Sequence, residues 1–403
     1  MSRSKPWFAL PIHTLALALI MAAPFPAAAQ EFIYTANFAD QNVSAFSLNL
    51  ATGKATEVPG SPFPAGEGPT SITNSPDGRF LYVVLAGELI DRPCGGPTDL
   101  LSYRINQRTG ALTLIDDQVL SGVCASGVAI DPTGRFVYAA SFPLEGPAKV
   151  GLIDGYRTSN GHLIPLPGTP FASPIGVADG QNPAIDNMVI SRNGKVLYAS
   201  DPNDAAGILI FDRDRETGTL TFRKAFNSGT AFGAIAITPS GKFLLAPSGT
   251  DMFEYRIGAH GNLKSAPGSP FTLSAVALEV DVFPDGTVSV SPNGKFVATT
   301  ARAVDMQRAN QDGRLISVPG SPFGGGFVGF TLAFDPSGHF VITDGRIFRV
   351  NQETGALRQV STFTPGDFVE GITAIKPCEA RHGDGDRDGD DCRRDDDAIR
   401  GRD

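Results

Sequence analysis

The fold is decided by the stretch Ser75-Pro76-Asp77-Gly78-Arg79-Phe80-Leu81-Tyr82-Val83-Val84. Pro at the second position of the first four residues and Gly at the fourth favour a tight β-turn. The apolar run that follows is typical of a buried strand. The phrase returns with its turn at residues 131–134, 238–241, 291–294 and 335–338, and with Arg in place of Pro at 191–194.

Each copy of the turn joins two apolar strands, and hairpins such as Asn106–Leu112 and Asn351–Leu357 add two more. The seventh copy of the strand that follows the turn lies at Phe32–Thr35, at the start of the mature chain. The strand that should precede it is found at the other end of the chain, at Ile372–Ile375. Equivalent positions recur every 44–60 residues, which is the size of one propeller blade. The sequence therefore predicts an all-β, seven-bladed β-propeller of four-stranded antiparallel blades, closed by pairing of the N- and C-terminal strands in one blade.

The two ends of the chain differ from the repeats. Arg3 and Lys5 precede an apolar run, and Ala27-Ala28-Ala29 supplies a cleavage site, so we expect a signal peptide at 1–29 and a secreted or periplasmic protein. The run is short for a membrane anchor, and no transmembrane segment is expected after cleavage. The propeller then spans 30–378, and residues 379–403 form an Asp- and Arg-rich acidic tail that we expect to be disordered.

The charge of the chain limits its partners. A formal net charge of −9 argues against nucleic acid and anionic lipid, both of which reward clustered Lys and Arg. We expect a monomer that binds a small lactone-like or sugar-like molecule, or a protein partner. Export also places four cysteines in an oxidising compartment, and the blade topology favours the pairs Cys94–Cys124 and Cys378–Cys392.

The repeated phrases resemble those of the lactonase-type seven-bladed propellers, a group that includes 6-phosphogluconolactonase, the carboxymuconate cycloisomerases and the YVTN-repeat proteins. The resemblance covers Phe32 to Pro377 and implies a site at one mouth of the central channel, with His, Glu and Arg side chains. The step that carries imidazoles in the enzymes reads Pro69-Thr70-Ser71 here. His162, His260 and His339 fall in turns, where a solvated role is expected.

Loops at the predicted mouth still supply carboxylates and arginines. Lactone hydrolysis needs a base and a donor for the developing oxyanion, and Ca²⁺ binding needs several carboxylate oxygens, so both remain open alongside a solvated role. The catalytic candidates are Glu88, Arg92, Glu145, Asp201, Glu279, Arg302, Asp344, Arg346 and Glu370.

Two further motifs have a structural and a functional interpretation. The phrase Pro-Gly-Ser-Pro-Phe, at Pro59, Pro267 and Pro319, is expected to cross between blades with Phe in the groove, although an exposed Phe could also dock a partner. In the tail, Asp384, Asp386, Asp388, Asp390 and Asp395 have the spacing of a calcium loop, although a run of this kind is also typical of disorder.

No cofactor is required by these patterns, and Ca²⁺ is the candidate ligand ion. The sequence predicts an exported lactonase-like propeller that acts as a ligand- or partner-binding or scaffold module. The alternative is a lactonase, a 6-phosphogluconolactonase-like hydrolase or a cycloisomerase acting on a sugar or organic-acid lactone at the channel mouth.

Overall fold

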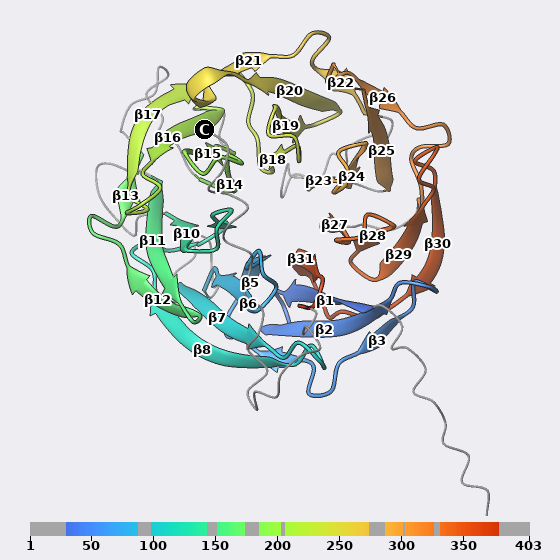
Figure 1. Cartoon of the computed structure of the whole chain (residues 1–403), viewed down its shortest axis with the longest axis horizontal. Coiled ribbons are helices and arrows are strands. Elements are labelled where there is room, and N and C mark those ends of the chain that lie inside the picture. The colour runs from blue at the N-terminus through green and yellow to red at the C-terminus, as the bar shows by residue number, and fades with distance from the viewer. Residues whose placement is uncertain are drawn as a thin grey trace, which may run out of the picture.

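Seven antiparallel sheets surround a central channel in the computed structural model of the chain (Figure 1). The structure describes residues 30–87, 98–142, 151–173, 185–202, 206–273, 287–300, 303–310, 312–325 and 331–378. The predicted all-β, seven-bladed propeller is confirmed. No helix in this described part of the chain is long and apolar enough to span a bilayer.

Each blade runs outward from the channel through four strands. Blade 1 contains β31 (Val369–Ile375), β1 (Gln30–Asn37), β2 (Asn42–Asn49) and β3 (Ala55–Glu57). Blade 2 contains β5 (Pro69–Asn74), β6 (Phe80–Leu85), β7 (Asp99–Ile105) and β8 (Leu112–Val119). Blade 3 contains β9 (Val128–Ile130), β10 (Phe136–Ser141), β11 (Leu152–Ser159) and β12 (His162–Pro165). Blade 4 contains β14 (Met188–Ile190), β15 (Val196–Ser200), β16 (Ile208–Arg213) and β17 (Leu220–Phe226).

Blades 5 to 7 have the same arrangement. Blade 5 contains β18 (Ala236–Ile237), β19 (Phe243–Ser248), β20 (Asp251–Ile257) and β21 (Leu263–Ser265). Blade 6 contains β23 (Val288–Val290), β24 (Phe296–Thr300), β25 (Val304–Ala309) and β26 (Leu315–Ser317). Blade 7 contains β27 (Leu332–Phe334), β28 (Phe340–Thr343), β29 (Arg346–Val350) and β30 (Leu357–Thr362). A 3-10 turn, η1 (Ala259–Gly261), lies between β20 and β21.

Three blades carry one more strand than predicted. The two-residue strands β4 (Phe63–Pro64), β13 (Phe171–Ala172) and β22 (Phe271–Thr272) each pair with the third strand of blades 1, 3 and 5. All three begin at the Phe of a Pro-Gly-Ser/Thr-Pro-Phe phrase. In the same phrase, the hydroxyls of Ser61, Thr169, Ser269 and Ser321 accept backbone N–H bonds from the third strand. Phe63 and Phe171 of this phrase also pack in hydrophobic clusters that join neighbouring blades, in line with the predicted position of Phe in the groove.

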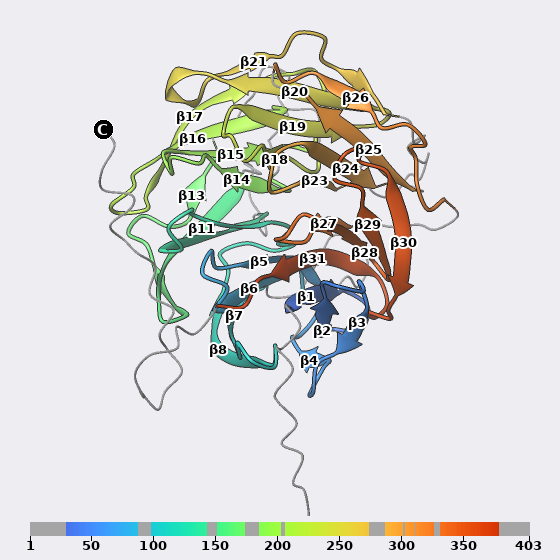
Figure 2. The same cartoon turned by 45° about the vertical axis from the view of Figure 1, so that its right-hand side comes forward.

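The ring closes through the blade that the two ends of the chain share. Strand β1 pairs antiparallel with β31, with Phe32 opposite Ile375 and Ala36 opposite Gly371. The two strands lie side by side in both cartoon views (Figures 1 and 2). This confirms the predicted closure, which leaves no blade with an incomplete sheet.

The two flat faces of the disc differ in their connections. We call one face the turn face, because it holds the tight turns between the first and second strands and the hairpins between the third and fourth strands. The opposite face, which holds the connections after the second and fourth strands, is called the mouth face. On the turn face, the first residue of each turn accepts the N–H of the residue five positions later, as Ser75 does from Phe80 at 2.9 Å and Asp131 from Phe136 at 2.8 Å. Ser191, Thr238, Ser291 and Asp335 repeat the bond.

The seams between blades are built on a contact between a glycine and a large side chain. Each hairpin glycine lies against a residue at or near the start of the second strand of the preceding blade. A methyl group added to Gly110 would lie 2.5 Å from the Phe32 ring, so only glycine fits there. The seven pairs are Phe32–Gly110, Phe80–Gly161, Phe136–Gly218, Val196–Gly261, Phe243–Gly313, Phe296–Gly355 and Phe340–Gly53. The last pair joins blade 7 to blade 1.

Hydrogen bonds and stacked arginines reinforce these seams. The buried hydroxyls of Tyr34, Tyr138 and Tyr198 donate to the carbonyls of Gly110, Gly218 and Gly261 in the next blade, at 2.8, 2.5 and 2.8 Å. Arginines at the ends of third strands stack over the seam rings and donate to the next hairpin. Arg349, for example, lies 4.6 Å from the Phe340 ring centroid and bonds the Ala51 carbonyl at 2.7 Å.

Two seams hold a buried carboxyl group where the tyrosine is missing. Blade 5 has Leu245 in the tyrosine position, and its cross-strand partner Glu254 is 1% exposed, with an oxygen against Gly313. Neither of its carboxyl oxygens has a hydrogen-bond partner among the described residues. Burial raises the pKa of Glu254 to about 8. Burial and then the neighbouring Asp335 carboxylate raise the pKa of Glu31, at the blade 7–blade 1 seam, to about 8 as well.

The cysteine pairs stay a prediction. Neither Cys124 nor Cys378 is a free thiol among the described residues. Their predicted partners, Cys94 and Cys392, lie outside those residues.

The seam contact predicts the cost of one methyl group. Gly110→Ala should lower the free energy of unfolding by about 1–3 kcal/mol more than Gly229→Ala, because the added carbon overlaps the Phe32 ring. Gly229 is the matched control, since its φ of 68° resembles the 77° of Gly110 but nothing lies within 4 Å of an added methyl. Chemical denaturation measures both variants. Equal losses would show that the seam tolerates the extra carbon.

The buried carboxyl of Glu254 predicts a pH-dependent stability. Because its pKa is raised in the folded state, folded protein holds the proton more tightly than unfolded protein, and stability falls as pH rises from about 4.5 toward 8. Glu254→Gln keeps the shape and removes the titration. Its melting temperature relative to wild type should therefore rise between pH 5 and pH 9, by about 2 °C or more. A difference that stays constant across this range would rule out a buried neutral carboxyl.

Candidate functional site

Four of the nine predicted catalytic residues lie within the described part of the chain. They are Asp201, Asp344, Arg346 and Glu370, and all four are on the mouth face, as expected. The other five candidates, Glu88, Arg92, Glu145, Glu279 and Arg302, lie outside the described residues, as do the calcium candidates Asp384, Asp386, Asp388, Asp390 and Asp395. Among the described residues, no group of three or more His, Cys, Asp or Glu side chains is placed to hold a metal ion.

Asp201 has a structural role in its loop. It follows β15 and is fully buried, and its carboxylate accepts the N–H of Ala206 at 2.8 Å. Its carbonyl accepts the N–H of Phe232 at 3.0 Å, which ties the loop to the next crossing. These bonds commit Asp201 to holding the connection from β15 to β16.

Asp344 and Arg346 flank Gly345 in the short connection from β28 to β29. The Arg346 guanidinium is half-buried and donates to the carbonyl of Gly324, in the crossing from blade 6, at 3.0 Å. Blade 7 and blade 4 lie on opposite sides of the channel in Figure 1, so this pair and Asp201 do not share a site.

Glu370 lies at a β-bulge on the innermost strand of blade 1. Ala36 of β1 faces Gly371 of β31, and the adjacent Asn37 faces Val369, so Glu370 is the extra residue of the bulged strand. A bulge of this kind leaves one residue outside the ladder and re-aims its side chain, and bulges are frequent beside active sites. The half-buried Glu370 is therefore the predicted residue whose backbone geometry most favours a functional role.

A second bulge lies beside the first, on the innermost strand of blade 2. Pro69 faces Leu85 and Ser71 faces Val84, which leaves Thr70 unpaired in the ladder. The two strands approach closely here, since a methyl group added to Gly371 would lie 3.2 Å from the Thr70 carbonyl oxygen. Thr70 Oγ1 donates to the Ala125 carbonyl at 3.0 Å, so this hydroxyl, in the place of a family imidazole, ties blade 2 to blade 3.

An aromatic pair that sequence reasoning missed lies next to Glu370. Phe368 has a φ of 57°, a left-handed conformation that is a true outlier for a bulky residue, and its side chain is 40% exposed. Its carbonyl accepts the N–H of Phe38 at 2.9 Å, and the two rings meet edge to face with centroids 5.8 Å apart. Backbone strain of this kind concentrates at functional sites. The sequence Gly-Asp-Phe-Val at 366–369 gives no sign of the positive φ at Phe368.

The described part of the mouth face is acidic. This part comprises the described connections of the face and the first two residues of each strand that follows such a connection. All of its charged residues except Arg346 are carboxylates. These carboxylates belong to Asp40, Glu67, Asp99, Asp186, Asp201, Asp251, Asp305, Asp344, Asp367 and Glu370. The turn face differs, because a basic residue follows the turn glycine in five blades, at Arg79, Arg135, Lys195, Lys242 and Lys295.

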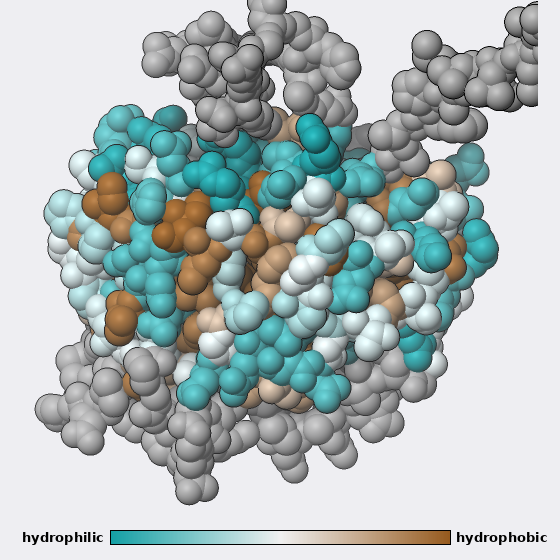
Figure 3. All heavy atoms as spheres, turned by 90° about the horizontal axis from the view of Figure 1, so that it is seen from below, coloured by the Kyte–Doolittle hydropathy of each residue, from teal (hydrophilic) through white to brown (hydrophobic). Residues whose placement is uncertain are grey.

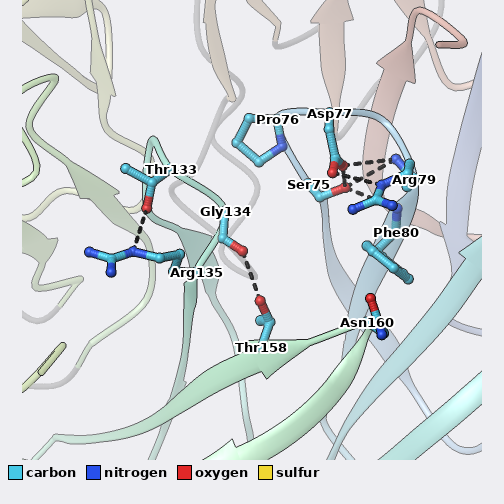
Figure 4. Close-up of a pocket in the computed structure, with 10 residues that line it drawn as sticks. All are labelled: Ser75, Pro76, Asp77, Arg79, Phe80, Thr133, Gly134, Arg135, Thr158 and Asn160. Atoms are coloured by element: carbon cyan, nitrogen blue, oxygen red, sulfur yellow. Dashed lines mark hydrogen bonds and ion pairs between the residues drawn. The ribbon is translucent and has the colours of Figure 1, made fainter. Parts of the chain in front are cut away.

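A small cavity of about 190 Å³ lies on the turn face, between blades 2 and 3. Its polar groups bond one another: Arg79 Nε donates to Asp77 at 2.9 Å, and Thr158 Oγ1 donates to the Gly134 carbonyl at 2.8 Å (Figure 4). Because these groups belong to the repeated turns and hairpins, the cavity is a product of the blade seam. The rim of the disc, seen from below the first view, mixes hydrophobic and hydrophilic side chains (Figure 3).

Comparison with known proteins agrees with this architecture. Residues 32–161 match the family model described as lactonase, seven-bladed β-propeller. This segment is similar to the lactonase-type propellers. No curated protein matches the chain.

Solved structures show the same fold over nearly their whole length. A candidate 6-phosphogluconolactonase from Bacteroides uniformis superposes with a TM-score of 0.70 at 19% identity, covering 86% of this chain and 99% of that one. The periplasmic gluconolactonase of Pseudomonas aeruginosa gives 0.67 at 17% identity, with 86% and 99% coverage. A candidate 6-phosphogluconolactonase from Bacteroides fragilis gives 0.68 at 18%, with 88% and 100% coverage.

The strain at Phe368 predicts an unusual order of stability. Phe368→Gly and Phe368→Ala delete the same ring, but only glycine adopts a positive φ without steric cost. The free energy of unfolding of the Gly variant should therefore equal that of the Ala variant or exceed it by up to about 1 kcal/mol. Denaturation of both variants measures this. A clearly more stable Ala variant would mean that residue 368 has an ordinary negative φ.

Proposed function

We propose that this propeller hydrolyses a lactone at the mouth junction of blades 1 and 2, where Glu370, Phe38 and Phe368 meet. The observation that carries the proposal is the pair of bulges at Glu370 and Thr70, on the neighbouring inner strands β31 and β5. The lactonase family match and the likeness to a periplasmic gluconolactonase fold support it.

The chemistry needs a base, a donor for the oxyanion and a surface that orients the substrate. Glu370 takes a proton from water as the water oxygen attacks the lactone carbonyl carbon. The carbonyl oxygen becomes an oxyanion, which backbone N–H groups can stabilise. The innermost strands pair on one side only, so β31 and β5 present N–H groups with no partner in their sheets. The ring C–O bond then breaks, and the departing oxygen takes the proton back from Glu370.

The exposed Phe368 ring gives the substrate an apolar platform. One face of a sugar ring carries mainly C–H groups, which pack favourably on an aromatic surface. The strained backbone and the edge contact with Phe38 hold this ring beside the bulge. Its role is to position the lactone carbonyl toward Glu370.

Two expectations from the sequence remain proposals. The leader at 1–29 directs export to the periplasm or outside the cell. The Asp-rich tail binds Ca²⁺ at extracellular concentrations, which calorimetry on wild type and Asp384→Ala would test, since identical flat traces would exclude it.

Glu370→Gln is the decisive variant for catalysis. It keeps the size of the side chain and removes the base, so kcat on glucono-1,5-lactone should fall about 100-fold or more, with little change in KM. Glu353→Gln on the turn face is the control and should match wild type. A pH-stat assay, with and without Ca²⁺, measures the rates above spontaneous hydrolysis.

Two results would contradict the proposal. Wild-type protein without activity on a panel of sugar and organic-acid lactones would favour the binding or scaffold module instead. Full activity in Glu370→Gln would move the base to another mouth residue.

A further inference from the structure

We infer that the site accepts an uncharged lactone and discriminates against a phosphorylated one. The inference rests on the proposed function and concerns the substrate class of the same site. It follows from the charges that surround the mouth junction, and it separates the two kinds of lactone in the names of the structural relatives.

Three exposed carboxylates border the aromatic pair. Asp40 Oδ2 accepts the N–H of Asp367 at 2.8 Å, which brings two of these residues together directly before Phe368. Glu67 precedes Gly68, where an added methyl group would lie 3.0 Å from the Phe38 ring. A substrate that stacks on Phe368 therefore meets negative charge from both blades of the junction.

The same sign of charge continues around the face at blade 2. Burial and then the Asp117 carboxylate raise the pKa of Asp99, at the first residue of β7. Burial and then the Asp116 carboxylate raise the pKa of Asp117 in turn. The described part of blade 2 thus adds closely spaced carboxylates to those of the junction.

A phosphate monoester carries −1.5 to −2 charges at neutral pH, so the mouth repels it, whereas a neutral lactone feels no net force. Hydrolysis converts the neutral lactone and water into a hydroxy acid, which loses a proton to solvent and becomes an anion. The product thereby gains the charge that the mouth repels. The negative charge of the mouth therefore does not oppose binding of the neutral substrate, and it favours release of the anionic product.

Glu67 provides a graded test, because its side chain is exposed and takes no part in the proposed chemistry. Hydrolysis of glucono-1,5-lactone and of 6-phosphoglucono-1,5-lactone is measured on wild type, Glu67→Gln and Glu67→Lys at low and high salt. The kcat/KM for the phosphorylated lactone should rise about twofold for each unit of positive charge added at low salt. The kcat/KM for the neutral lactone should stay unchanged. Glu353→Lys makes the same charge change on the turn face and should alter neither.

Salt gives an independent readout on the wild type. Raising ionic strength screens repulsion, so kcat/KM for the phosphorylated lactone should increase while that for the neutral lactone stays constant. A phosphorylated lactone that reacts faster than the neutral one, with a kcat/KM that falls as salt is added, would overturn the inference and leave the lactonase intact. No hydrolysis of either lactone would instead overturn the proposed function.

Discussion

The contact between a large apolar side chain, in six of the seven seams an aromatic ring, and a hairpin glycine is the constraint on which the propeller depends. A four-stranded blade has two apolar faces and cannot bury them alone, so its stability comes from its neighbours. The ring of Phe32 occupies the space that a side chain at position 110 would need, and the same exclusion operates at each of the seven seams. Because the pair Phe340–Gly53 returns to blade 1, every blade is held on both sides.

The rigidity of these seams frees the opposite face for function. Tyrosine hydroxyls, stacked arginines and turn carboxylates such as Asp131 and Asp335 are all committed to structure on the turn face. On the mouth face, by contrast, the described charged residues are mainly carboxylates, and two inner strands leave the regular ladder at Glu370 and Thr70. One face therefore carries the bonds that hold the ring together, and the described part of the other carries irregular backbone and mainly carboxylates.

The parts of this structure that sequence predicts are those whose chemistry is local. Ser75 to Gly78 contain every residue that their turn needs. The repeat has a second strand at Phe32 without a first strand before it, and the missing first strand is found at Ile375. The candidate site is different, because the Glu370 bulge is a mismatch between two strands more than 300 residues apart, and neither strand shows it alone. The strain at Phe368 likewise arises from contacts with the loop that holds Phe38. Asp201, a catalytic candidate from the sequence, follows β15, and its buried carboxylate accepts the N–H of Ala206.

The shared blade also fixes where the two ends of the propeller emerge. Strand β1 begins, and strand β31 ends, on the turn face, with Phe32 opposite Ile375. Anything joined to either end, such as a purification tag, a tether to a surface or a fused domain, therefore leaves from the face opposite the mouth. An immobilised molecule attached by either terminus presents the same open side to solution, and joining the two ends by a short linker would allow the chain to be reopened at another connection.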